Sequence, residues 1–129
     1  MDSYIQNKLK KMKEEHMFMA CGNPKYEILE TLIDSGYDPN TTDSYGMSVL
    51  MFASKINENP AVIQMLLCKN ACLDARDFDG RNVVHYAAVN TNPKIYEWMK
   101  EDSDFEHLLN KKDCNVKTPE YYHGHMDEF

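Results

Sequence analysis

The chain has 129 residues, of which 43% are hydrophobic and 27% are charged, and its formal net charge is −7. This length fits one compact domain or a short repeat array rather than two ordinary domains. It contains no apolar run near the roughly 18 residues of a membrane helix, and its charged beginning lacks an apolar signal region. The acidic balance argues against a protein that binds nucleic-acid phosphates through a basic face. We therefore expect a globular protein of the cytoplasm or the nucleus.

The first predicted element is an amphipathic helix over residues 3–16. It opens with a Ser-Tyr-Ile-Gln capping box at Ser3, and Ile5, Leu9 and Met12 form an apolar stripe along it. We expect the helix to cap one end of the fold, with this stripe facing inward and its lysines in solvent. The alternative is a basic amphipathic helix that lies on a membrane, although acidic residues dilute its charge.

Internal repetition dominates the rest of the chain. An aspartate, a glycine and an alanine recur 34 residues apart, since Asp43, Gly46 and Ala53 correspond to Asp77, Gly80 and Ala87. A related stretch around Ala20 precedes them, and Asp113 opens a further unit. Such a period indicates a stack of small helical units. We expect the alanines to lie where neighbouring helices touch, and Gly80 to adopt the positive φ of a tight turn.

A second landmark recurs in the same units. The asparagine–proline pairs at Asn23, Asn59 and Asn92 each precede an apolar run. Asparagine is a favourable N-cap, and proline fits the first helical position because its missing N–H has no partner there in any helix. Each unit therefore predicts a turn, a short helix, a loop and a second helix.

These residues resemble the ankyrin repeat, whose unit reads roughly D-x-x-G-x-T-P-L-H-x-A-A. Residues 77–88 match it best, and the last unit carries the literal Thr118-Pro119 pair. The resemblance covers residues 17–122 and implies an all-α solenoid of about three full repeats, an N-terminal helical cap and a partial C-terminal repeat. The boundaries that we expect are 1–16 for the cap, 17–42, 43–76 and 77–112 for the repeats, and 113–129 for the partial repeat and tail.

The sequence departs from the family pattern in the second half of the chain. Val116 stands where the turn of the family has glycine. About three additional residues near 101–105 predict a second helix that is longer or kinked. His123 and His125 could share a metal, but two ligands are fewer than a site usually has, and we expect a disordered polar tail instead.

We expect no catalytic centre and no cofactor. His85 occupies the histidine position of the family, which usually orders the turn, and no serine or cysteine nucleophile has a matching spacing. Neither of the glycine-rich phosphate-binding motifs occurs. None of the four cysteines forms a C-x-x-C pair, which predicts free thiols in a reducing compartment.

The third unit carries two features with open interpretations. The acidic run from Glu97 to Glu106 is either a solvated face or a docking patch for a basic partner segment. Trp98 is expected to fill the core between repeats rather than to anchor a partner.

The resemblance also implies that the turn tips and the inner face of the first helices form a concave surface that binds other proteins. Aromatic, methionine and arginine side chains are enriched at such interfaces. The repeat register assigns to this surface Ser44, Tyr45, Met47, Phe52, Lys55, Ile56, Phe78, Asp79, Arg81, Tyr86, Val89, Cys114, Asn115 and Lys117. The alternative for the aromatic tips is that their rings fold back onto neighbouring turns.

The function that we expect is non-catalytic binding of another protein, as an adaptor or assembly factor. The alternative is a regulatory inhibitor that masks a basic segment of a transcription factor or signalling protein, similar to the inhibitors of Rel-type transcription factors. Neither nucleic acid nor a membrane is an expected partner. An enzyme would need converging catalytic groups, which the sequence does not present.

Overall fold

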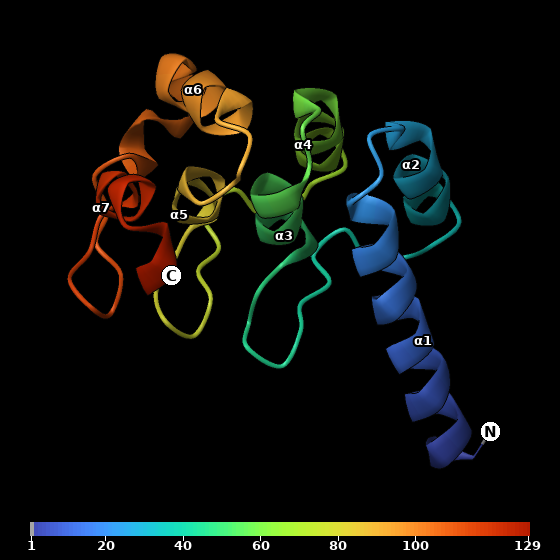
Figure 1. Cartoon of the computed structure of the whole chain (residues 1–129). Coiled ribbons are helices and arrows are strands. Elements are labelled where there is room, and N and C mark those ends of the chain that lie inside the picture. The colour runs from blue at the N-terminus through green and yellow to red at the C-terminus, as the bar shows by residue number, and fades with distance from the viewer. Residues whose placement is uncertain (1) are drawn as a thin grey trace.

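The computed structural model describes residues 2–129 and confirms the expected all-α repeat solenoid. Figure 1 shows α1, α3, α5 and α7 following one another across the molecule, with α2, α4 and α6 above them and three long turns projecting from the opposite side. The elements are α1 (Ser3–Cys21), α2 (Tyr26–Asp34), α3 (Val49–Ile56), α4 (Pro60–Cys68), α5 (Val83–Ala88), α6 (Lys94–Glu101), the 3₁₀ helix η1 (Ser103–Leu108), α7 (Pro119–Gly124) and the 3₁₀ helix η2 (Met126–Glu128).

A polar residue at the end of each long turn is the N-cap of the helix that follows it. Ser48 accepts a hydrogen bond from the backbone N–H of Met51 at 3.1 Å, and Asn82 accepts from Val84 at 2.9 Å. Thr118 caps α7 in the same way, with proline at the first helical position. These caps satisfy N–H groups that have no partner within the helix, so the start of each helix is fixed locally.

The asparagine of each asparagine–proline pair makes one recurring contact. Asn23, Asn59 and Asn92 each accept a hydrogen bond from the backbone N–H two residues later, at 2.8, 3.1 and 3.0 Å. Only Asn59 is the residue that immediately precedes its helix, because α2 and α6 begin later, at Tyr26 and Lys94. The pattern therefore fixes the turn before each second helix, and in α4 the helix start as well.

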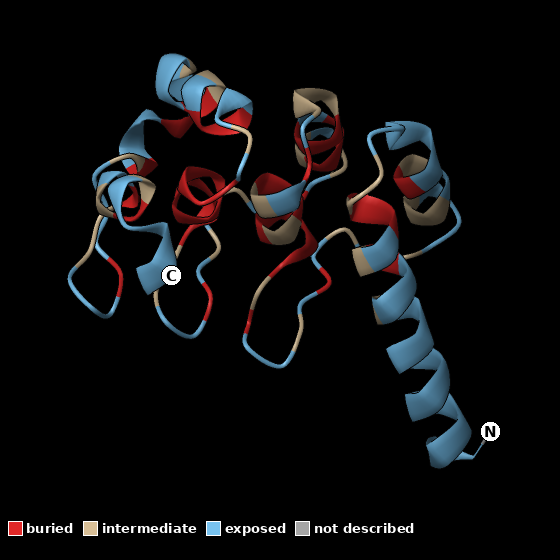
Figure 2. Cartoon of the chain, viewed as in Figure 1, coloured by how far each residue is buried: buried red, intermediate tan, exposed pale blue. Residues whose placement is uncertain are grey.

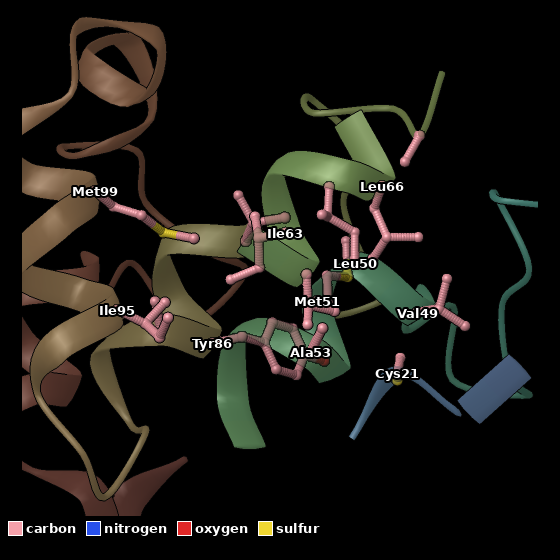
Figure 3. Close-up of a cluster of buried hydrophobic side chains, with 14 of the residues drawn as sticks. Cys21, Val49, Leu50, Met51, Ala53, Ile63, Leu66, Tyr86, Ile95 and Met99 are labelled. Atoms are coloured by element: carbon pink, nitrogen blue, oxygen red, sulfur yellow. The ribbon is translucent and has the colours of Figure 1, made fainter. Parts of the chain in front are cut away.

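The apolar core runs through the stack without interruption. Figure 3 shows side chains of neighbouring helices meeting in it, among them Leu50, Met51, Ile63, Leu66, Ile95 and Met99, and all six are buried. The alanines expected at the contacts between first helices, Ala20, Ala53 and Ala87, are buried as well, and α3 packs on both α1 and α5. A single helix pair could not bury this surface, so each unit depends on its neighbours.

The N-terminal helix differs from the expectation of a separate cap. Residues 3–21 form one continuous helix, so the expected boundary between residues 16 and 17 falls inside it, and Asp2 rather than Ser3 is the N-cap, accepting from the Tyr4 N–H at 3.0 Å. Figure 2 shows the first half of α1 projecting from the stack with an exposed surface. Ile5, Leu9 and Met12 of the apolar stripe are accordingly 44–48% exposed and do not belong to the core. Within residues 2–129, no helix combines the length and the apolar character needed to cross a membrane.

The second half of the third unit and the tail also take definite structures. Helix α6 stops at Glu101, and the additional residues form η1, in which Phe105 is buried with its ring 5.1 Å from that of Trp98. Trp98 is half-buried and packs against the core.

The expectation of a disordered tail is wrong: α7 runs to Gly124 and η2 follows it. Phe129, the last residue, contacts Arg81 and Tyr86, which are distant in the sequence. No local sequence pattern predicts these contacts.

Candidate functional site

The three projecting turns share one hydrogen-bond scheme, built around an aspartate at the same place in each. One carboxylate oxygen of Asp43, Asp77 and Asp113 accepts two backbone N–H groups, those two and four residues later, at 2.9–3.0 Å. The backbone N–H of each aspartate in turn donates to the carbonyl of the residue four positions later in the chain. Each turn is therefore a closed loop whose shape its own aspartate holds.

The residue at the bend of each turn has a positive φ. Gly46 and Gly80 have φ of +78° and +76°, which confirms the expectation for Gly80, and Val116 adopts +61° in the third turn. A β-branched residue is strained in this region, so the last turn keeps the shape of the others at a cost in stability.

Backbone hydrogen bonds join each turn tip to the next. The N–H of Phe78 donates to the carbonyl of Tyr45 at 3.0 Å, and the N–H of Cys114 donates to the carbonyl of Asp79 at 2.8 Å. Three tips that belong to different repeats are thus aligned in one row, which is visible as the row of loops in Figure 1. The row is a continuous ridge rather than three independent loops.

Two aromatic side chains stand on this ridge. Tyr45 is 74% exposed and Phe78 is 76% exposed. The Phe78 ring lies directly against Gly46 of the neighbouring turn. The contact is so close that a Cβ added at Gly46 would lie 2.8 Å from the ring. The ring therefore contacts the neighbouring tip and still presents most of its surface to solvent.

The other residues assigned to the concave surface fall into three groups. Ser44, Ile56, Asp79, Cys114 and Asn115 are exposed, while Met47, Phe52, Lys55, Arg81 and Lys117 are half-buried. Tyr86 and Val89 are buried, with exposed fractions of 5% and 7%, so neither adds to the free surface. The surface continues onto α1, where a groove of about 750 Å³ lies between the helix and the turn at residues 42–44.

The sequence analysis did not assign α1 to this groove. Phe18 and Met19 line it together with lysines and glutamates of the same helix, and the Phe18 ring lies 5.8 Å from that of Phe52 in an edge arrangement. The signal was the recurrence of phenylalanine at Phe18 and Phe52, 34 residues apart, a spacing close to the repeat period.

Two buried aspartates accept hydrogen bonds from tyrosine hydroxyls next to the inner face. Asp77 accepts a hydrogen bond from the Tyr86 hydroxyl at 2.5 Å, and Asp113 accepts one from the Tyr122 hydroxyl. Burial and this hydrogen bond raise the pKa of Tyr86 above its ordinary value. Burial alone would raise the pKa of Asp113, but the hydrogen bond from Tyr122 and those from the backbone outweigh it and hold the pKa low.

Arg81 contacts Phe129, the residue that follows η2. Its guanidinium carbon is 3.9 Å from the ring centroid of Phe129, and its Nη2 donates to the Phe129 carbonyl at 3.1 Å. The same side chain lies near Asp113, with Nε 3.7 Å from a carboxylate oxygen. The tail thus covers part of the surface that the sequence assigned to a partner.

The histidines have structural contacts. In His85, Nδ1 accepts from the Asn82 N–H at 3.1 Å and Nε2 reaches the Lys117 carbonyl at 2.9 Å, so Nε2 carries the proton and the ring joins two repeats. Desolvation by burial lowers the pKa of His85. His123 and His125 do not converge, because Nδ1 of the first faces the carbonyl of Ala88 and the second stacks on Tyr121.

Two buried asparagines that the sequence analysis overlooked connect the units. The Asn57 amide donates to the carbonyls of Cys21 and Asn23, at 2.9 and 3.0 Å. The amide of Asn90 donates to the carbonyls of Ser54 and Asn57, at 3.0 and 2.9 Å. The repeated Asn-x-Asn-Pro at residues 57–60 and 90–93 was the available signal, of which only the second asparagine was interpreted.

Comparisons with known proteins bear on the whole array. A family model for ankyrin repeats in three copies matches residues 17–118. The chain is 29% identical over 103 residues to the human transient receptor potential cation channel subfamily A member 1, an alignment covering 75% of this chain and 9% of the channel. It is 35% identical over 75 residues to the ankyrin repeat domain-containing protein SAT10 of Stachybotrys chartarum, covering 58% of this chain and 4% of that protein. The chain thus spans only a small part of these relatives.

Proposed function

The chain belongs to the ankyrin-repeat family, whose repeats are generally protein–protein interaction modules, and we propose that it binds a protein partner without catalysis through its turn tips and concave face. An adaptor or assembly factor fits this activity, since the array offers a rigid surface. The observation that carries the proposal is the ridge of turn tips with the exposed rings of Tyr45 and Phe78.

Physical reasons favour a partner at these two rings. Tyrosine and phenylalanine are enriched at interfaces, and they bring a large contact area at little conformational cost. The backbone hydrogen bond between the two tips fixes the spacing of the backbone positions that carry the rings before any partner arrives. A preorganised pair loses little entropy on binding, which favours hot-spot behaviour.

A second candidate function is the masking of a basic partner segment. The acidic residues Glu97, Glu101, Asp104 and Glu106 are all exposed on α6 and η1. Figure 1 places these elements on the side away from the turn tips, so a basic segment bound there would use a different face. Binding at that face would weaken strongly with salt, because screened charges would supply most of the attraction.

The free cysteines support a reducing compartment for this interaction. Cys68, Cys72 and Cys114 are exposed free thiols, and Cys21 is a buried one whose pKa burial raises to about 12. Thiols of this kind persist in the cytoplasm or the nucleus rather than in secreted proteins.

Comparative affinity capture tests the proposal. The intact chain and the double variant Tyr45→Ala/Phe78→Ala are used as baits, with Tyr26→Ala as an aromatic control on the outer helix α2. We expect the same partner with the intact chain and with Tyr26→Ala, and a reduced amount with the double variant. Equal recovery with the double variant, together with loss at high salt, would favour the acidic face instead.

A further inference from the structure

The last residues of the described chain occupy a definite place on the concave face. The Phe129 ring lies 4.9 Å from the ring of Tyr86 and 5.2 Å from that of Tyr122, edge-on to both. Arg81 lies over it at 3.9 Å, and Nζ of Lys55 is 5.5 Å from its centroid. Two aromatic walls and two cations therefore surround one phenylalanine.

The four residues around this ring come from separate elements. Lys55 belongs to α3, Arg81 precedes α5, Tyr86 lies in α5 and Tyr122 lies in α7. We call these four residues the aromatic seat. The repeat stack brings them together, so the seat is a product of the tertiary fold rather than of the tail.

Contacts that do not involve Phe129 hold the seat in shape. Asp77 fixes the Tyr86 hydroxyl, and Asp113 fixes that of Tyr122. Arg81 lies within ion-pair distance of Asp113. The seat is thus preorganised, and removal of the Phe129 ring should leave its walls in place.

The contacts of residues 125–129 with the rest of the fold are limited. The Phe129 carbonyl accepts a hydrogen bond from Arg81, and within the described residues the other hydrogen bonds from this segment to the rest of the fold go to Tyr121 and Tyr122 of α7. Glu128 accepts from the hydroxyl of Tyr121, on which His125 stacks at 4.2 Å. Apart from these bonds to α7, the segment is held on the concave face by the contacts of Phe129, and those contacts can be exchanged for the contacts of a competing segment.

We propose that the aromatic seat is a docking site for an aromatic side chain presented by a partner protein segment, and that Phe129 fills it intramolecularly until such a segment displaces it. The partner segment carries acidic residues beside its aromatic residue, as Asp127 and Glu128 stand beside Phe129. This inference rests on the proposed function, since it assigns a particular ligand chemistry to part of the same concave face.

Two features of the seat select that chemistry. A guanidinium 3.9 Å from a ring centroid attracts an aromatic ring more than an aliphatic side chain of similar size. Within residues 2–129, neither Lys55 nor Lys117 forms an ion pair with a carboxylate, so both can attract acidic flanks.

A peptide added in trans tests the seat without any partner. The probe is acetyl-His-Met-Asp-Glu-Phe-amide, the sequence of residues 125–129 with both ends neutral, titrated into the ¹⁵N-labelled full chain carrying Phe129→Ala. We expect saturable amide shifts at Lys55, Arg81 and Tyr86. We expect the intact chain to bind the peptide at least about threefold more weakly, because its own ring holds the seat closed for part of the time.

A matched peptide with leucine in place of phenylalanine tests the choice of an aromatic ring. It should bind the Phe129→Ala chain about 3- to 10-fold more weakly, the range that a cation–π contact corresponds to. Circular dichroism checks that Phe129→Ala is folded, and Phe129→Leu replaces it if it is not.

Three results would overturn the inference. Absence of saturable shifts in Phe129→Ala would show that the seat takes no aromatic ligand. Equal peptide affinity of the intact chain and the variant would show that Phe129 does not compete, and equal affinity of the two peptides would remove the aromatic preference. The tip variant Tyr45→Ala/Phe78→Ala leaves the seat intact and should bind the peptide normally, so failure of tip binding is distinguishable from failure of the seat.

Discussion

Equivalent positions in two turns should respond in opposite directions to the exchange of glycine and valine. Gly80 and Val116 both lie at the bend of a turn, with φ of +76° and +61°. A β-branched residue there costs about 1–2 kcal/mol relative to glycine in conformational strain. Gly80→Val should therefore destabilise the fold, and Val116→Gly should stabilise it.

The surroundings set the two magnitudes. A Cβ at Gly80 would lie 3.1 Å from both the backbone nitrogen and Sγ of Cys114, which adds an overpacking cost to the strain. Gly80→Val should thus lower the free energy of unfolding by about 2–4 kcal/mol. Val116 is 67% exposed, so Val116→Gly relieves strain without leaving a cavity. Its gain should be about 0.5–1 kcal/mol, since glycine also increases the entropy of the unfolded chain.

Urea unfolding followed by circular dichroism measures both changes as shifts of the midpoint at constant slope. Gly124→Ala is the control for an ordinary backbone conformation, because Gly124 ends α7 and no heavy atom lies within 4 Å of the new Cβ, and it should stabilise the fold by about 0.4–1 kcal/mol. A destabilised Val116→Gly, or a Gly80→Val chain as stable as the original, would refute the argument that positive φ governs these turns.

Three further predictions concern the interior of the stack. Ala87→Leu should lower the free energy of unfolding by about 1–3 kcal/mol through overpacking where α5 lies against α3, and an unchanged melting temperature would contradict the register. Asn90→Ala should cost about 2–4 kcal/mol in urea unfolding, because the buried carbonyls of Ser54 and Asn57 lose their donor, whereas Asn110→Ala at an exposed position should change little. His85 should titrate below its ordinary pKa of about 6.5 in NMR spectra, since burial disfavours its charged form. The unfolded chain then binds this proton first, so stability should fall as the pH drops from about 7 toward 5, and a normal or raised His85 pKa would contradict the assigned burial.

The turns and the helices that follow them could be predicted from the sequence because their signals are local. An aspartate that caps its own turn and a glycine at the bend act within a few residues, and Asp77 and Gly80 behave as this local chemistry requires. The alanine spacing likewise predicted the buried contacts between units, because a periodic sequence folds into periodic packing.

The ends of the array were harder to predict, for two different reasons. In α1 the residues around position 16 contain no helix breaker, so the helix continues through the boundary that the family register suggested. At the other end, Phe129 lies over Arg81, 48 residues away in sequence, and no local pattern reports such a contact. The Phe129 ring also lies against Tyr86, which is a buried member of the core, and the free surface of the concave face is smaller than expected.

The central claim, that this array binds a protein through its turn tips, is tested most directly by calorimetry with the captured partner. The titration compares the intact chain with Tyr45→Ala/Phe78→Ala, after circular dichroism has shown the same helical content in both. We predict that the double variant binds more weakly by about 1–4 kcal/mol, the range for aromatic hot spots. Full-strength binding by the folded double variant would contradict the claim and would move the site to another face.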